Sequence, residues 1–194
     1  AIRGLGQTFN KGQGFKHQIL RAIVKRLYSV ACSCCNNVWF TNKNDLKYFL
    51  NTNVVTNEQA FLTKNAVDLS HFSQRKVLKK TVKGLRKELA LCPEDKVVIM
   101  VARLIWSKGV REFVEAAISL FPKFPRVHFL LVAPMETGSS EAVPECFIRN
   151  GELNSNLKWL GFRKDVRELY SISDLSVLPS YYKEGGYPRA LLEA

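Results

Sequence analysis

The sequence predicts an α/β protein built on a Rossmann-like parallel sheet with helices on both faces, and three observations predict that fold class. First, from about residue 77 onward, short apolar runs alternate with longer amphipathic stretches, as in strands joined by helical crossovers. Second, these runs are almost continuously apolar, which is typical of strands buried on both faces. Third, a chain of 194 residues that is 46% hydrophobic can bury one or two compact cores.

After the end of a strand and a tight turn, predicted at residues 1–6, the first part of the chain is predicted to contain two helices and two short strands. Residues 15–33 carry apolar side chains at helical spacing, and four basic residues lie on the other faces of this helix: Lys16, Arg21, Lys25 and Arg26. A short buried strand is expected at 38–41, a helix at 44–50 and a strand at 60–62, followed by a turn-rich stretch. The basic helix is compatible with a core helix whose cationic face is solvated, or with contact to anionic lipid.

The second part is predicted to begin with a long basic helix at 77–91, so that a domain boundary falls near residues 65–77. The strands that follow are expected at 97–101, 127–132, 157–160 and 175–178. Helices are expected between them, at 109–120, 141–149 and 166–172, and a last helix begins near Pro188. Such crossovers are what parallel strands require, because a hairpin joins only antiparallel ones.

The net charge of +12 is concentrated in the first part of the chain. Residues 1–76 hold 11 Lys and Arg against 3 Asp and Glu, whereas residues 77–194 hold 18 against 14. Such an excess favours anionic partners, namely nucleic acid, an acidic membrane surface or phosphorylated substrates. A non-catalytic nucleic-acid-binding module is therefore one alternative, but its interleaved aromatic stacking platforms are lacking. A dinucleotide-dependent enzyme is another, but no Gly-x-Gly-x-x-Gly follows a predicted strand.

Cysteine spacing and hydropathy narrow the class of protein further. The five cysteines have none of the paired spacings of zinc sites or disulfide frameworks. We therefore expect them to be small buried hydrophobic residues in a reducing compartment, and we expect no bound metal. No apolar run approaches the roughly 18 residues of a spanning helix, so a soluble or peripheral protein is expected. The chain begins without methionine at Ala1 and stops within an apolar helical pattern at Ala194, so we expect truncation at both ends.

Two cations follow the strand predicted at 97–101. Ligands of open parallel sheets bind beyond the carboxyl ends of the strands. Arg103 and Lys108 straddle this strand end and the start of the next helix, so both could converge on one phosphate group. The guanidinium offers a planar fork, the ammonium a point charge, and the helix N-terminus unpaired N–H groups. Taken alone, the pair could also be a solvated surface pair.

The turn after the strand predicted at 157–160 is a weaker candidate. Gly161 permits close approach of the backbone, and a base or sugar could lie over the turn at Phe162 and Arg163. Asp165 is expected to cap the helix that follows.

The loop after the strand predicted at 175–178 is dense in polar and aromatic groups. Gly185 and Gly186 can present bare N–H groups to an anion, and Tyr187 follows them. Glu184 precedes the glycines and Glu193 lies on the helix behind, so the two carboxylates could bind hydroxyls on two parts of one ligand. The coincidence of such groups at three successive strand ends predicts a ligand site there.

Three spans resemble the retaining family 4 glycosyltransferases, namely residues 101–109, 161–166 and 178–194. Residues 65–68 are similar to that family's Asn-Gly-Val-Asp segment near the domain junction. Gly4-Leu5-Gly6, the basic helix after it and residues 106–113 are most similar to bacterial enzymes that extend undecaprenyl-diphosphate-linked sugars. The family has the GT-B architecture, in which two Rossmann-like domains face a cleft. The resemblance covers nearly the whole chain and implies about half of a full enzyme.

The resemblance implies a GT-B-like fragment truncated at both ends. Residues 1–70 would be the C-terminal part of the N-terminal, acceptor-side domain, and residues 71–194 the N-terminal part of the nucleotide-sugar-binding domain. Arg103 and Lys108 would hold the donor diphosphate, and Glu184 would contact the transferred sugar. Other donor-binding roles would fall to Phe162, Arg163, Gly185, Gly186, Tyr187 and Glu193, with the uracil against the 162–163 turn and the ribose hydroxyls on Glu193. Gly4 and Gly6 would belong to an acceptor-side loop.

The resemblance also implies the reaction. A hexose or N-acetylhexosamine would pass from a UDP-sugar to a polyprenyl-diphosphate-linked saccharide with retention of anomeric configuration, without bound metal and with no cofactor besides the donor. The enzyme would be cytoplasmic and peripheral at the inner face of the cytoplasmic membrane, in contact with its anionic surface and not with nucleic acid. The chain departs from the family in four places. Ala66 replaces the usual glycine of the junction segment, and the early donor-side glycine loop of the first domain is absent from this sequence. Eight residues lie between Glu184 and Glu193, one more than is usual in the family. Ala133-Pro134 stands where the family commonly has glycines after a strand.

Overall fold

The computed structural model describes residues 15–73, 77–181 and 186–194. The chain folds as two units, of which the first comprises Ala1–Ala66 with Lys183–Arg189 and the second Val67–Tyr182 with Ala190–Ala194. The assignment of residues 1–70 and 71–194 to an acceptor-side and a nucleotide-sugar-binding domain stays a prediction.

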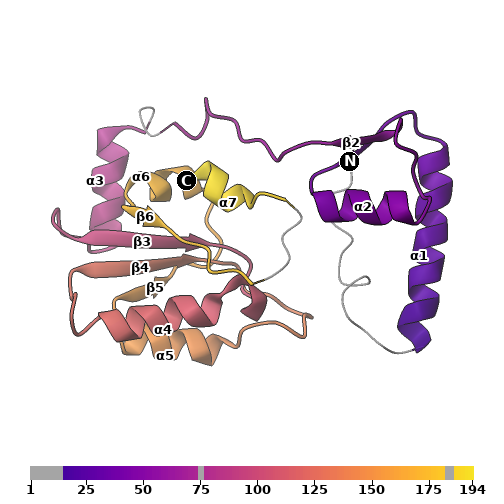
Figure 1. Cartoon of the computed structure of the whole chain (residues 1–194). Helices are drawn as coiled ribbons and strands as arrows, with labels where there is room; N and C mark the ends of the chain where they lie inside the picture. Colours follow the sequence, from indigo (N-terminus) through magenta and orange to yellow (C-terminus); the bar gives the residue numbers. More distant parts are fainter. Residues whose placement is uncertain (1–14, 74–76, 182–185) are drawn as a thin grey trace. The chain divides into compact units, whose positions relative to one another are not determined.

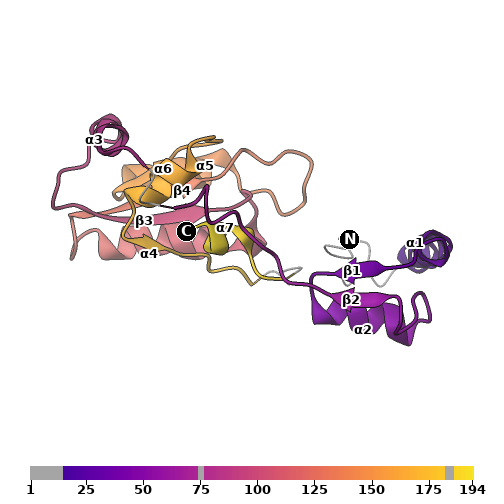
Figure 2. The same cartoon turned by 90° about the horizontal axis from the view of Figure 1, so that it is seen from above.

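The first unit contains two helices and a pair of parallel strands. In order these are α1 (Phe15–Ser33), β1 (Val38–Phe40), α2 (Lys43–Asn51) and β2 (Ala60–Leu62). The strands pair from Val38 with Ala60 to Phe40 with Leu62, and Figure 2 shows them side by side, with α1 seen nearly end-on. The core of the unit is centred on Phe49. Its ring lies edge-on to the rings of Tyr28 and Phe40, with the ring centroids 5.1 Å apart in each pair. All four predicted elements are confirmed, although Trp39 in the predicted buried strand is 54% exposed.

Helix α1 packs on its unit through its less apolar side. Cys32 is buried and Val24 and Tyr28 are half-buried, as are the cationic residues Arg21 and Lys25. The most apolar stripe of the helix faces outward, with exposed fractions from 46% to 63%: Ile19, Leu20, Ile23, Leu27 and Val30. Because 100° separates successive residues, the contact of Tyr28 with Phe49 turns this stripe away from the unit. The expectation of a core helix with a solvated cationic face is therefore wrong for Arg21 and Lys25.

The second unit is built on a four-stranded parallel sheet. Its strands are β3 (Lys96–Val101), β4 (Val127–Val132), β5 (Leu157–Trp159) and β6 (Leu175–Ser176), arranged in the order β5-β4-β3-β6. Every pairing is parallel, as the sequence predicts. The last strand, Leu175–Ser176, is shorter than the predicted range 175–178, although the Val177 N–H still donates to the Ile99 carbonyl of β3 at 2.9 Å.

Helices cover both faces of this sheet (Figure 1). They are α3 (Lys79–Glu88), α4 (Val110–Leu120), α5 (Glu145–Leu153), α6 (Val166–Ser171) and α7 (Arg189–Glu193), with a 3-10 turn, η3, at Trp106–Lys108. Helices α4 and α5 pack together on one face, and α3 and α6 pack together on the other. A core cluster lies on each side, one around Phe113 and Phe129 and the other around Leu130 and Leu169. This confirms the predicted layered architecture.

Two predictions, one about the second unit and one about the cysteines of both units, need correction. Helix α5 begins at Glu145 instead of residue 141, because Pro144 takes an extended conformation at the N-cap position. The cysteines are free, but of the five only Cys32 is buried, so the prediction of small buried hydrophobes is wrong for the other four: Cys34, Cys35, Cys92 and Cys146. These four lie on loops or on outward-facing parts of helices, which the sequence spacing does not reveal.

Candidate functional site

The strand order of the second unit reverses at β3. The chain passes outward from β3 to β4 and β5, and then returns to place β6 on the opposite side of β3. Ligands of doubly wound sheets bind at such a reversal, outside the carboxyl ends of the strands. The segments that leave the sheet there are residues 102–109 after β3 and residues 177–181 after β6. Arg103 and Lys108 lie on the first of these segments.

The two segments are joined by hydrogen bonds on Ser107. Its carbonyl oxygen accepts from the Tyr181 backbone N–H at 3.1 Å and from the Ser180 hydroxyl at 3.2 Å. Ser107 itself is only 5% exposed. The segment carrying Arg103 and Lys108 is therefore fixed against the segment that leads into the predicted glycine loop.

Gly109 makes the closest approach between the same two segments. Its backbone has φ +82°, which is left-handed, and it ends η3 and begins α4. A Cβ atom at this position would lie 2.3 Å from the carbonyl oxygen of Pro179. Only glycine fits both the dihedral angle and the space. Gly109 is therefore needed for the close packing of the two segments that follow β3 and β6.

A third segment, after β4, braces η3 from the other side. Glu141 accepts a hydrogen bond from the Ser107 hydroxyl on its carboxylate and one of 2.9 Å from the Trp106 N–H on its carbonyl oxygen. The Val143 N–H donates to the Leu104 carbonyl at 3.1 Å, and Ile105 forms an antiparallel bridge with Ala142. Sequence reasoning assigned no role to Ser107 or Glu141, because their contact spans 34 residues.

The two predicted diphosphate ligands lie within this braced segment. Arg103 follows β3 and is exposed, and Lys108 is half-buried at the end of η3. Helix α4 begins at Val110 directly behind them and is 11 residues long. The unpaired amides and positive dipole end at its start add to the two side-chain charges. The arrangement can bind an anion beyond β3.

The turn after β5 presents an aromatic side chain and a left-handed glycine. Phe162 is 69% exposed, and Gly161 has φ +62° with open space around its Cβ position. The guanidinium of Arg163 makes two hydrogen bonds, at 2.8 and 2.7 Å, to the carboxylate of Asp165 and one of 2.7 Å to Glu88 on α3. These bonds, that to Asp165 foremost, raise the pKa of Arg163.

The same ion pair changes the role expected of Asp165. The residue occupies the N-cap position of α6, but its side chain makes no capping hydrogen bond. Its carboxylate is instead taken by Arg163, and that hydrogen bond lowers the pKa of Asp165. The prediction of a capping side chain is therefore wrong, because a charged donor two residues away competes better than a backbone amide.

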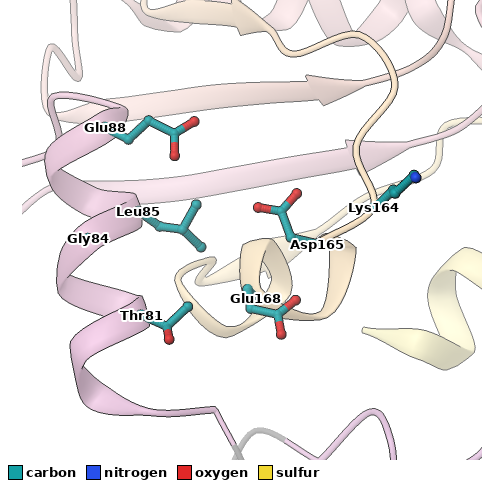
Figure 3. A pocket seen from close by; sticks show the side chains of 7 residues that line it. All are labelled: Thr81, Gly84, Leu85, Glu88, Lys164, Asp165 and Glu168. Atoms are coloured by element: carbon teal, nitrogen blue, oxygen red, sulfur yellow. The ribbon is translucent and has the colours of Figure 1, made fainter.

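An open hollow of about 600 Å³ lies between α3 and the start of α6. Figure 3 shows Glu88 from α3 and Asp165, the residue before α6, projecting into the same space, while Lys164 points away from it. Arg163 bridges these two carboxylates, and Arg167 pairs with Glu168 at the other side of the hollow. The ionic groups of the hollow thus neutralise one another, and they connect α3 to the turn that carries Phe162.

Helix α7 is anchored to the second unit through Tyr170. The Tyr170 hydroxyl donates to the Ala190 carbonyl at 2.7 Å, and burial, with the nearby charge of Glu193, raises the pKa of this phenol. Glu193 is half-buried near this contact. Gly186 and Tyr187 belong to the first unit. Glu184 and Gly185, like Gly4 and Gly6, lie outside the described residues, so the predicted convergence of Arg103 with the 184–186 turn stays a prediction.

A protein-family model described as glycosyl transferases group 1 matches residues 82–194, which contain the braced segments, the 162–163 turn and α7. The chain belongs to this family. Over an alignment of 193 residues, which covers essentially the whole chain, it is 32% identical to the N,N'-diacetylbacillosaminyl-diphospho-undecaprenol alpha-1,3-N-acetylgalactosaminyltransferase of Campylobacter jejuni. The alignment covers 48% of that protein, so the chain spans about half the length of this curated relative.

Solved structures show the same fold. HepE from Anabaena, crystallised in complex with UDP and glucose, aligns with a TM-score of 0.67 and 24% identity over 88% of this chain and 46% of its own. A glycosyltransferase from Rickettsia africae aligns with a TM-score of 0.64 and 19% identity over 84% of this chain and 42% of its own. The fold predicted from the strand and helix pattern, a GT-B-like fragment, is thereby confirmed.

Two searches of the described residues concern membranes and metals. None of the helices there has both the length and the apolar character needed to cross a bilayer. Across residues 15–73, 77–181 and 186–194, no group of three or more His, Cys, Asp or Glu side chains could hold a metal ion. Metal independence and the absence of a cofactor stay predictions.

Proposed function

We propose that the protein to which this chain belongs is a retaining glycosyltransferase that moves a hexose or N-acetylhexosamine from a UDP-sugar to a lipid-diphosphate-linked saccharide. One observation carries the proposal. The segment with Arg103 and Lys108 leaves the sheet at the strand-order reversal, and its Ser107 and Gly109 fix it to the segment that leaves β6. Two cations and a helix N-terminus at that place suit the diphosphate of a nucleotide sugar.

The chemistry required is the departure of a nucleoside diphosphate from the anomeric carbon. Negative charge builds on the diphosphate as the glycosidic bond breaks. Arg103 and Lys108, held before the reaction begins, would stabilise this charge, and donors fixed in advance do so at little reorganisation cost. This electrostatic role is why we infer that no bound metal is needed. The Campylobacter relative is named for an alpha-1,3 linkage, which an α-configured donor yields only by net retention.

Recognition of the nucleoside is proposed for the turn after β5 and for α7. Because Asp165 and Glu88 hold the Arg163 guanidinium, the uracil contact would fall chiefly on the exposed Phe162 ring and on the backbone at Gly161. Glu193, beside the Tyr170 anchor, would bind the ribose hydroxyls. Glu184, with the N–H groups of Gly185 and Gly186 and with Tyr187, would contact the transferred sugar. HepE, a structural neighbour, was solved with UDP and glucose, which supports UDP as the nucleotide.

The acceptor and the cellular site are proposed from the relative's name and from the charge. The Campylobacter protein is named for a diphospho-undecaprenol substrate, which is anchored in a membrane. A chain with net charge +12 is attracted to anionic surfaces. We therefore infer a peripheral enzyme at the inner face of the cytoplasmic membrane that takes part in bacterial surface polysaccharide or glycan assembly.

The test is turnover by the full-length enzyme carrying Arg103→Ala or Lys108→Ala. Each change should lower kcat by about 10²- to 10³-fold, the usual loss when one such charge-stabilising group is removed. Lys123→Ala is the matched control, since Lys123 lies in the exposed loop that enters β4, at the opposite edge of the sheet. Turnover within about threefold of wild type for both test variants would refute the role. Calorimetric titration with UDP and then GDP would report the nucleotide preference independently.

A further inference from the structure

The first unit contains a cavity of about 460 Å³, and two of its lining residues, Gly186 and Tyr187, are also proposed to contact the transferred sugar. It lies at the carboxyl ends of β1 and β2, which meet at one edge because the strands are parallel. Nine residues line it: Thr41, Asn42, Lys43, Leu62, Thr63, Lys64, Gly186, Tyr187 and Pro188. Its lining combines hydroxyl groups, an amide and two ammonium groups, and it contains no carboxylate.

The positive charge of this cavity is not neutralised by the residues around it. Lys43 and Lys64 are both exposed, and neither forms an ion pair with any residue that the structure describes. The nearest carboxylate in sequence, Asp45, is buried and accepts a 2.7 Å hydrogen bond from the Asn42 side chain. Lys43 is also the first residue of α2, a helix of nine residues, so the positive end of the helix dipole lies at the same edge. The cavity is therefore suited to an anion.

One wall of the cavity is the continuation of the predicted donor-sugar loop. The Asn65 side-chain amide donates to the Tyr187 carbonyl at 2.6 Å. A Cβ atom on Gly186, whose φ is +128°, would lie 2.7 Å from the Thr41 carbonyl oxygen. Residues 186–188 are thus seated on the first unit, and two of them, Gly186 and Tyr187, are also proposed to contact the transferred sugar.

We propose that this cavity binds the diphosphate of the lipid-linked acceptor, with Lys43 and Lys64 as its cationic ligands. The inference rests on the proposed function and names the acceptor-binding part of that function. In a saccharide linked to a lipid diphosphate, the first sugar separates the accepting hydroxyl from the diphosphate by about one ring. The residues proposed to contact the transferred sugar include Gly186, which lines the cavity, so a diphosphate one ring from the accepting hydroxyl is proposed to bind there. Ammonium groups bind phosphate as point charges and tolerate varied orientation.

The experiment is steady-state kinetics of the full-length enzyme with a short-chain polyprenyl-diphosphate-linked sugar. Lys43→Ala and Lys64→Ala should each raise KM for this acceptor about tenfold, which corresponds to the loss of about 1.4 kcal/mol of binding. KM for the UDP-sugar should stay within about twofold. The double variant should also show a weaker dependence of acceptor KM on salt, since two of the screened charges are gone. Lys43→Arg and Lys64→Arg should recover most of the affinity.

Lys47→Ala is the matched control, because Lys47 is an exposed lysine of the same helix that does not line the cavity. Inorganic pyrophosphate should inhibit the wild type competitively against the acceptor, and more weakly in the double variant. The inference is overturned if acceptor KM is unchanged in the double variant, or if the lysine changes raise KM for the UDP-sugar instead. Failure of the proposed function is separate, since it would appear as full turnover in the Arg103 and Lys108 variants.

Discussion

The two units of the chain differ in what their apolar side chains meet. In the second unit, four parallel strands lie between two pairs of helices, and residues on both faces of the sheet, among them Ile99, Met100 and Leu130, are 0% exposed. In the first unit a two-stranded sheet leaves Trp39 and Phe61 54% and 47% exposed, and the apolar stripe of α1 faces outward. Both units contain similar elements, so the difference lies in the number of layers that cover them.

This contrast shows which part of the chain determines its own packing. A sheet covered on both faces fixes each apolar side chain against neighbours from the same unit. A two-stranded sheet with two helices buries much less, and such small sheets are marginal on their own. The exposed apolar surface of the first unit agrees with a chain that spans about half the length of its curated relative. We therefore expect core substitutions to have unequal effects in the two units.

The largest expected effect comes from truncating a leucine in each unit. Leu130→Ala removes a fully buried side chain from the second unit and should lower the free energy of unfolding by about 2–5 kcal/mol. Leu27→Ala removes a side chain that is 63% exposed on α1 and should change it by less than about 0.5 kcal/mol. Urea denaturation followed by circular dichroism measures both. Equal losses in the two variants would show that something covers α1 in solution.

A second pair of substitutions tests the close approach at the candidate site. Gly109→Ala forces a Cβ atom against Pro179 in a left-handed conformation, and should cost on the order of 2–3 kcal/mol of stability. UDP affinity should fall with it, because the segment carrying Lys108 is displaced. Gly84→Ala, in the middle of α3 with nothing within 4 Å of the new Cβ, should stabilise the protein by about 0.5–1 kcal/mol. Thermal unfolding and UDP titration distinguish the two, and tight UDP binding by Gly109→Ala would contradict the displacement.

The elements of the fold were predictable because their signals are local. Apolar runs and helical spacing located every strand and helix of the second unit, and errors occurred where one residue outweighs the pattern, as Pro144 does at the start of α5. The brace of the site was not predictable. Ser107 meets Glu141 across 34 residues and Ser180 across 73, and such contacts depend on which strands become neighbours.

Charge partners were the other information that the sequence lacked. The family resemblance implies that Arg163, in the turn after β5, lies against a uracil. Whether its guanidinium is available depends on Glu88, 75 residues earlier in the chain. The outward stripe of α1 has the same origin, since only the contact of Tyr28 with Phe49 fixes the rotation of that helix. Local pattern predicts that a helix is amphipathic, while tertiary contacts decide which side is covered.

Removal of the Glu141 brace should have a smaller, kinetic effect. Glu141→Ala deletes the acceptor of the Ser107 hydroxyl, so Lys108 is held less firmly, and kcat of the full-length enzyme should fall about tenfold, or about 1.4 kcal/mol. Glu141→Gln keeps an acceptor oxygen and should retain turnover within about threefold. Unfolding temperature should be nearly the same for both variants. If kcat is equal in the two variants, the hydrogen bond between Ser107 and Glu141 does not help to position Lys108, and the prediction is wrong.

The smallest expected effect is a pH dependence confined to the second unit. Burial lowers the pKa of His128 below its ordinary 6.5, opposed by Asp95, whose carboxylate lies 3.2 Å from Nε2, and assisted by Lys158 and Arg86. Because the folded pKa is depressed, the unfolded chain binds the proton more readily, so stability is lost as pH falls below 6.5. Asp165, whose pKa is lowered chiefly by Arg163, loses its contribution only below about pH 3.8, outside this window. His128→Gln should therefore reduce the decline in unfolding free energy between pH 7.5 and 5.5. If the decline is equally steep in this variant, a group other than His128 causes it.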